Sequence, residues 1–138
     1  MRAGGQTLNE AWAGGAEAYY GMAVSGFPNL FLMLGPNSGL GHNSMILMME
    51  AQARYIRQCI ARIQGEGLHS LDVKPAAQRA FNVRLQQRLA GAVWAGGCQS
   101  WYLDGEGRNT ALWPGHVFEY QLRTRRPRRP DFRAHQTA

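Results

Sequence analysis

An apolar run, a glycine-rich loop and a long helical pattern follow one another in residues 30–67, and this order constrains the fold most. Residues 30–34 (LFLML) are almost uninterruptedly apolar, which is typical of a strand buried on both faces of a parallel sheet. Gly35 and Pro36 end this strand, and Asn43 or Ser44 then offers a short polar side chain to cap a helix. The sequence therefore predicts an α/β protein.

Two helices are predicted from apolar spacing and from their end signals. The first should end at Gly65 and Gly67, and its expected buried stripe is Met45, Met49, Ala53, Ile56, Ile60 and Ile63. The second should begin at Pro75, where the missing N–H costs nothing, and end at Gly91. Its stripe is Phe81, Leu85 and Leu89. Both helices need a surface to pack on.

A tryptophan-rich hairpin is predicted after the second helix. Residues 101–103 have the character of a strand, residues 104–109 (DGEGRN) of a turn, and residues 110–113 of its return strand. Trp94, Trp101 and Trp113 fall within twenty residues of one another, as in a loop that covers a flat group. Residues 116–123 are expected to form a short strand or a helix turn.

Composition and charge limit the class of protein. The chain has 138 residues, about one domain, with 45% hydrophobic residues and a net charge of +6. Residues 123–138 hold six arginines and one aspartate, a balance of +5, which leaves +1 for the rest. Such an Arg- and Pro-rich tail is expected to be disordered or covered by a partner. A weak polyanion contact is a further alternative, whereas nothing indicates a sequence-specific nucleic-acid reader.

Metal, redox and membrane roles find little support in the sequence. Cys59 and Cys98 fit no metal or redox spacing and the histidines are scattered, so no metal site is predicted and Cys59 is expected to be a buried thiol. No apolar signal segment or membrane-length apolar stretch is visible. We therefore expect a soluble, cytoplasmic protein.

The loop at residues 35–44 (GPNSGLGHNS) is the candidate binding element. A glycine loop before a helix places backbone donors and the positive helix end at one point. The loop lacks the Lys-Ser/Thr ending of a P-loop, is not G-x-G-x-x-G, and does not place Ser44 in G-x-S-x-G. Spacing alone leaves two alternatives open, a contact with a cofactor and a purely structural turn.

Several segments in this order resemble the C-terminal part of Baeyer–Villiger-type flavin monooxygenases, and especially the 4-hydroxyacetophenone monooxygenase-like subgroup. The segments are residues 26–44, 50–56 (EAQARYI), 97–115 (GCQSWYLDGEGRNTALWPG) and 124–127 (TRRP), and the resemblance spans residues 8–126. The resemblance implies a C-terminal piece of a Rossmann-like flavoprotein that binds FAD and NADP on two dinucleotide-binding domains. These enzymes use NADPH and O₂ to insert one oxygen atom beside a ketone carbonyl or to oxidise a heteroatom.

The resemblance also implies site residues and a division of the chain. The cofactor-binding candidates are Gly35, Pro36, Asn37, His42, Asn43 and Ser44 at the flavin, with Trp101 over the nicotinamide. Tyr102, Asn109 and Trp113 would support the loop that carries Trp101. The implied parts are an entry segment (1–26), the last strand, loop and helix of the FAD-binding domain (27–67), a helix and covering hairpin (68–122), and a basic, disordered tail (123–138).

The chain lacks much of what the resemblance would require for activity. Neither dinucleotide fingerprint is present, nor is the family signature that combines Gly, His and Trp-Pro, and no catalytic residue is assigned. The chain is therefore expected to form one wall of a site, to need the missing N-terminal FAD and NADPH domains, and to be inactive alone. The alternatives are an accessory module that docks to a separately encoded flavoprotein half and a polyanion-binding protein that acts through the tail.

Overall fold

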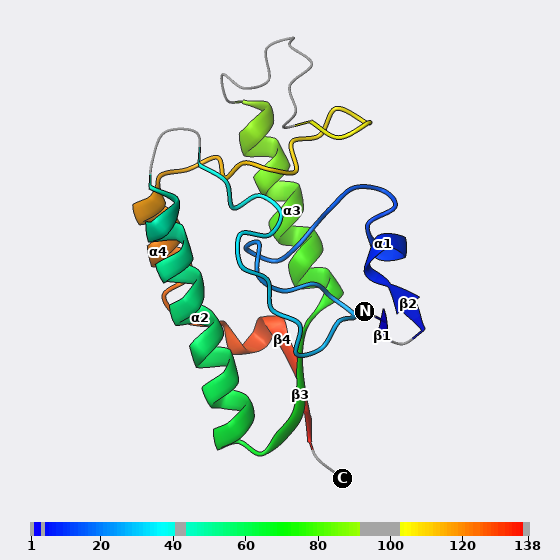
Figure 1. Cartoon of the computed structure of the whole chain (residues 1–138), viewed down its shortest axis with the longest axis vertical. Helices are drawn as coiled ribbons and strands as arrows, with labels where there is room; N and C mark the ends of the chain where they lie inside the picture. Colours follow the sequence, from blue (N-terminus) through cyan, green and yellow to red (C-terminus); the bar gives the residue numbers. More distant parts are fainter. Residues whose placement is uncertain (1, 4, 41–43, 92–102, 137–138) are drawn as a thin grey trace.

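Two long helices and a two-stranded sheet frame the molecule (Figure 1). The computed structural model describes residues 2–3, 5–40, 44–91 and 103–136. The helices are α1 (Leu8–Ala11), α2 (Met45–Gly65), α3 (Pro75–Ala90) and α4 (Val117–Arg123), with the 3-10 turn η2 (Arg129–Asp131). The strands are β1 (Arg2–Ala3), β2 (Gln6–Thr7), β3 (Leu68–Val73) and β4 (Phe132–Gln136). The predicted mixture of helices and strands is confirmed.

The first long helix begins and ends where the sequence predicted, but it buries a different face. Ser44 is the N-cap residue and α2 ends at Gly65. The buried positions are Met48, Ala51, Gln52, Tyr55 and Cys59, so the predicted stripe through Ala53 and Ile60 is wrong by about one position. The reason is a buried amide: the Gln52 Oε1 accepts the Leu34 N–H at 2.9 Å and its Nε2 donates to the Tyr120 hydroxyl at 3.1 Å. A pattern of apolar residues alone does not count Gln52 as a core residue.

Two further predictions on the helices are confirmed. Helix α3 begins at Pro75, has Gly91 as its C-cap residue and buries Phe81, Leu85 and Leu89. Cys59 is a fully buried free thiol, and burial raises its pKa to about 12. Such a thiol stays protonated and contributes only packing.

The predicted strand at residues 30–34 is not formed. Ala23 and Phe31 make a single antiparallel bridge, the Leu32 N–H donates to the Met22 carbonyl at 2.8 Å, and Leu34 has a φ of 53°. Met33 and Leu34 are 48% and 41% exposed, respectively. A strand buried on both faces needs hydrogen-bonded neighbours, and the described part of the chain supplies one short contact. Leu30, Phe31 and Leu32 are half-buried against the core, so only the end of the run is uncovered here.

The predicted disorder of the basic tail is also wrong. Strand β4 pairs antiparallel with β3, from Val73 opposite Phe132 to Leu68 opposite Gln136. Phe132 and Thr124 are buried, and Gln58 on α2 donates to the Arg125 carbonyl at 2.9 Å. A charge count missed this because the arginines face outward while the backbone supplies the pairing that β3 requires. Neither β3 nor β4 was predicted.

The tryptophan-rich segment folds differently from a simple hairpin. Leu103 and Asn109 form one antiparallel bridge around the predicted turn, but the predicted strand at Trp101 and Tyr102 lies outside the described residues. In the return segment, Leu112 bridges to Gly39 in parallel. Residues 117–123 form helix α4, one of the two alternatives predicted.

Candidate functional site

The glycine-rich loop lies against residues 110–113. The Asn37 N–H donates to the Thr110 carbonyl at 2.9 Å, the Gly39 N–H to the Ala111 carbonyl at 2.8 Å, and the Trp113 N–H to the Gly39 carbonyl at 2.8 Å. The first two bonds occupy backbone donors that a cofactor loop would otherwise present to a ligand. Residues 37–39 are thus held in place by the chain itself.

The glycines of this loop are explained by close backbone contacts. A Cβ atom on Gly39 would lie 2.8 Å from the Ala111 carbonyl oxygen. A Cβ on Gly35 would collide with the carbonyl of Gly21, and Gly21 itself has a φ of 70° and lies against Ser38 and Pro36. Glycine is therefore required at 35 and 39 for packing, whether or not a ligand is bound.

Asn37 joins the two segments through its side chain. Its Nδ2 donates to the Asn109 carbonyl at 2.7 Å and to the Leu112 carbonyl at 2.9 Å, and the residue is 2% exposed. Asn109 is buried too, and its Oδ1 accepts the N–H groups of Ala111 and Leu112. This buried amide pair fixes the distance between the loop and the segment opposite.

An open hollow of about 510 Å³ lies beside this junction. Its lining is mostly apolar, and no charged side chain of the described residues belongs to it. The lining residues are Leu34, Gly35, Pro36, Gly39, Leu40, Met45, Thr110, Ala111 and Leu112. Met45 is the first residue of α2, so the N-terminal end of this 21-residue helix borders the hollow. The partial positive charge of that end favours a group that carries or develops negative charge.

These features fit one part of a flavin better than the others. A flat, partly apolar ring suits the apolar lining, and its polar edge would meet the start of α2. A pyrophosphate would need free backbone donors or basic side chains. The described lining has no basic side chain, and the backbone donors of Asn37 and Gly39 are already bonded within the chain. The described residues therefore fit the ring and not the phosphates.

The structure separates the predicted site residues into three groups. Gly35 and Pro36 line the hollow, and Ser44 is exposed at the start of α2 without a side-chain capping bond. Asn37 is buried, and its side chain joins the loop to residues 109–112. His42, Asn43 and Trp101 lie outside the described residues.

Of the three residues predicted to support the covering loop, Asn109 and Trp113 occupy the interior, and Tyr102 lies outside the described residues. Asn109 belongs to the buried amide pair with Asn37. Trp113 is buried, its ring lies nearly parallel to that of Phe81, and its Nε1 donates to the His116 carbonyl at 3.3 Å. Sequence reasoning missed the part that Thr110, Ala111 and Leu112 play in the hollow. Nothing in the local sequence signals that they would meet a loop some seventy residues earlier.

The described residues contain neither a membrane-spanning helix nor a metal-binding cluster. None of the helices there is long and apolar enough to cross a membrane. The same residues contain no group of three or more His, Cys, Asp or Glu side chains placed to hold a metal ion.

Comparisons with known proteins give a consistent relationship. No protein-family model matches the chain. A Baeyer-Villiger monooxygenase from Streptomyces coelicolor is 48% identical over 126 residues, which cover 90% of this chain and 24% of that protein. The FAD-binding monooxygenase ktnD from Aspergillus niger is 40% identical over 135 residues, 94% of this chain and 22% of that protein. An oxidized steroid monooxygenase bound to NADP superposes with a TM-score of 0.83 at 25% identity, over 97% of this chain and 26% of that one.

Sequence and fold together therefore match a part of flavoprotein monooxygenases. Within that class the chain belongs to the Baeyer–Villiger monooxygenase family, as its motifs predicted. It spans about a quarter of the length of the curated relatives it matches. The finer assignment to the 4-hydroxyacetophenone subgroup stays a prediction.

Proposed function

We propose that this chain forms one wall of the flavin site of an NADPH- and FAD-dependent monooxygenase. The observation that carries the proposal is the apolar hollow at Gly35 and Pro36, bordered by the start of α2. In this proposal residues 27–67 belong to the FAD-binding part and residues 68–122 to the part that covers the cofactor. Family membership supports FAD and NADP as the cofactors, and a ketone or a heteroatom compound as the substrate of the complete enzyme.

Each described residue of the wall has a positioning task. FAD, when bound, supplies the redox chemistry of oxygen insertion, with NADPH as the reductant. Leu34, Leu40 and Met45 would exclude water from one edge of the ring, and the start of α2 would favour negative charge there. Asn37 would hold the wall in place from below. The contacts predicted for His42, Asn43, Ser44 and Trp101 belong to the same proposal.

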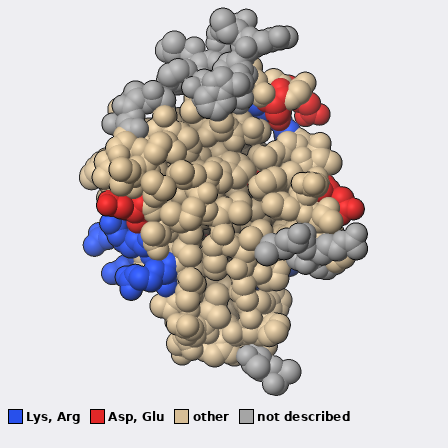
Figure 2. All heavy atoms as spheres, viewed as in Figure 1, with Lys and Arg blue, Asp and Glu red and all other residues tan. Residues whose placement is uncertain are grey.

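The wall is incomplete without further protein. Met33, Leu34, Ile46 and Leu47, close to the hollow in sequence, are all exposed large apolar side chains. The face in Figure 2 carries few charged side chains away from its edges. Apolar exposure of this kind usually marks a surface that another domain or partner covers. We therefore expect the chain to be inactive alone and to need the FAD and NADPH domains that its relatives contain.

A chimera tests this function directly. In the Streptomyces coelicolor relative, the matching 126 residues would be replaced by those of this chain. We expect the purified chimera to retain FAD and to oxidise NADPH in a ketone-dependent manner. The matched variant Leu34→Asp would place a charge at the hollow and should lower the FAD content, whereas Val83→Asp on the exposed face of α3 should not.

Other results of the chimera experiment would redirect the assignment. A folded chimera that binds no FAD would contradict the flavin wall. A chimera that holds FAD but turns over no substrate would favour the non-catalytic docking module. Tight, saturable FAD binding by the 138-residue chain alone would contradict the claim that the wall is incomplete.

A further inference from the structure

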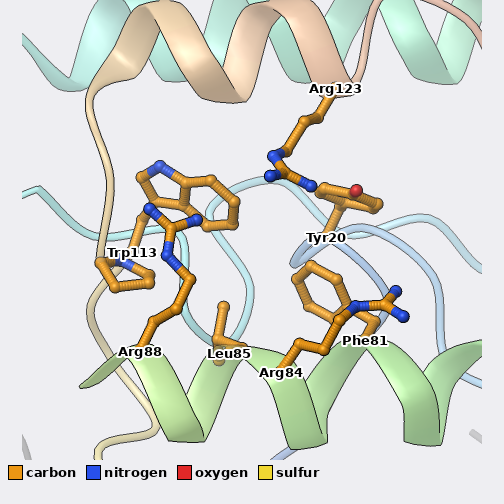
Figure 3. A pocket seen from close by; sticks show the side chains of 8 residues that line it. Tyr20, Phe81, Arg84, Leu85, Arg88, Trp113 and Arg123 are labelled. Atoms are coloured by element: carbon orange, nitrogen blue, oxygen red, sulfur yellow. The ribbon is translucent and has the colours of Figure 1, made fainter. Parts of the chain in front are cut away.

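A second cleft lies between α3, α4 and the loops, and its lining shares no residue with the hollow beside the glycine loop. The cleft measures about 80 Å³. It is lined from α3 by Phe81, Arg84, Leu85 and Arg88, from the loops by Tyr20, Trp113 and Pro114, and from α4 by Arg123. Figure 3 shows Trp113 and Arg88 on one side, Tyr20 and Phe81 on the other, and Leu85 between them on α3.

The walls of this cleft are flat and aromatic. The rings of Phe81 and Trp113 are nearly parallel, at an interplanar angle of 9° with their centroids 6.5 Å apart. The rings of Tyr20 and Phe81 lie 4.4 Å apart between centroids. Phe81 and Trp113 are both buried, so their positions are fixed by the core and not by the cleft. Rigid aromatic walls favour a planar, partly apolar group.

The rim carries more positive than negative charge. Three guanidinium groups line the cleft, and the carboxylate that two of them contact is Glu119. Arg88 binds Glu119 through two bonds of 2.7 and 2.9 Å, and the Arg123 Nε donates to it at 2.9 Å. Arg84 makes no ion pair with any described residue. The Arg84 guanidinium, a planar group with several N–H donors, can therefore bind an incoming anion at this cleft.

We propose that the cleft binds a small planar carboxylate, with Arg84 as its main anchor. The bidentate Arg88–Glu119 pair shows the geometry in which a guanidinium at this site holds a carboxylate. At about 10–15 Å³ per water-sized group, the cleft has room for about five to eight non-hydrogen atoms. A nucleotide is far too large, and a tetrahedral phosphate would leave the aromatic walls unused. The inference is independent of the flavin wall.

The test is a titration of the 138-residue chain with furan-2-carboxylate, followed by ligand NMR at constant ionic strength. Saturable binding in the millimolar range is expected. Arg84→Ala should weaken it at least about tenfold, and Arg84→Lys, which keeps the charge but loses the fork, by a smaller factor. The matched control is Arg79→Ala, since Arg79 is an exposed arginine on the same helix that does not line the cleft. Circular dichroism checks that each variant folds.

Two further ligands and the variants decide the outcome. Tetrahydrofuran-2-carboxylate has the same charge and nearly the same size but is not planar, and inorganic phosphate is a tetrahedral oxyanion; both should bind at least about tenfold more weakly. Equal binding of either one would overturn a planar carboxylate site. Equal weakening by Arg79→Ala would reveal only a general positive field, and an unchanged affinity in Arg84→Ala would remove the anchor. Absence of saturable binding to the native chain would reject the site.

Discussion

Replacement of Asn37 tests whether the loop is held by the chain's own contacts. The side chain makes two hydrogen bonds, to the carbonyls of Asn109 and Leu112, and it is almost fully buried. The backbone at Asn37 has a φ of 56°, in the left-handed region that asparagine tolerates better than alanine. Two different substitutions therefore separate the side-chain contribution from the backbone contribution.

The expected free-energy changes follow from these contacts. Asn37→Gly removes both hydrogen bonds; the Asn109 carbonyl keeps its bond from the Gln86 side chain, whereas the buried Leu112 carbonyl loses the Asn37 amide as its partner. This should lower the free energy of unfolding by about 2–3 kcal/mol. Asn37→Ala loses the same bonds and adds the strain of alanine at positive φ, about 1 kcal/mol more. At about 3 °C per kcal/mol for a domain of this size, the melting temperature should fall by about 6–9 °C and 9–12 °C, respectively.

Urea unfolding of the 138-residue chain, followed by far-ultraviolet circular dichroism, measures both changes. The matched control is Asn29→Gly, because Asn29 also has a positive φ, of 60°, and bonds the backbone of His69 and Leu71 from an exposed position. Its loss should cost about 1 kcal/mol, since water replaces the bonds. The reasoning fails if Asn37→Gly costs no more than Asn29→Gly, or if Asn37→Ala is as stable as Asn37→Gly.

Three further outcomes are expected from the same assay. Gly39→Ala should cost about 1–3 kcal/mol because its Cβ would lie 2.8 Å from the Ala111 oxygen, whereas Gly105→Ala, with no atom within 4 Å, should be nearly neutral. Phe132→Ala should lower the free energy of unfolding by about 3 kcal/mol if β4 is folded onto the core. A neutral effect would instead support the prediction that the tail is disordered. The side-chain bond from Arg88 lowers the pKa of the Glu119 carboxyl, with Arg123 assisting. The stabilisation by the ionised Glu119 carboxylate should therefore be complete above the ordinary glutamate pKa and be lost as the pH falls through the lowered pKa of Glu119. In Glu119→Gln, the free energy of unfolding should depend less on pH in this acidic range.

Local signals predicted the helices well because their causes are local. Pro75 begins α3 through its fixed φ and its missing N–H, and Gly91 ends that helix, whatever the rest of the chain does. The face that α2 buries depends instead on Gln52, whose partners Leu34 and Tyr120 lie far away in sequence. Apolar periodicity registers only apolar residues, so the predicted stripe was rotated.

The strands were predicted poorly because pairing is not local. Residues 30–34 have the composition of a buried strand, yet a strand exists only where neighbouring backbones complete its hydrogen bonds. The described residues place Met22 and Ala23 beside that run and nothing more extended. Conversely, β4 has a sequence dominated by polar residues and still pairs along β3, because the backbone of β3 needs a partner. Composition described the side chains of both segments and missed the availability of partners.

The glycine loop combines a local sequence signal with contacts that are distant in sequence. Its glycines suggested a ligand-binding loop, but Gly35 and Gly39 each pack closely against a backbone carbonyl of this chain, that of Gly21 and that of Ala111, respectively. Sequence cannot distinguish the two uses, since both require a missing Cβ. The side of the loop that faces the hollow nevertheless remains apolar and open beside the start of α2, and the residues that enforce its shape are buried behind it. A loop rigidly held by its own chain is what a flavin wall requires, because a preorganised surface loses little entropy when the ring binds.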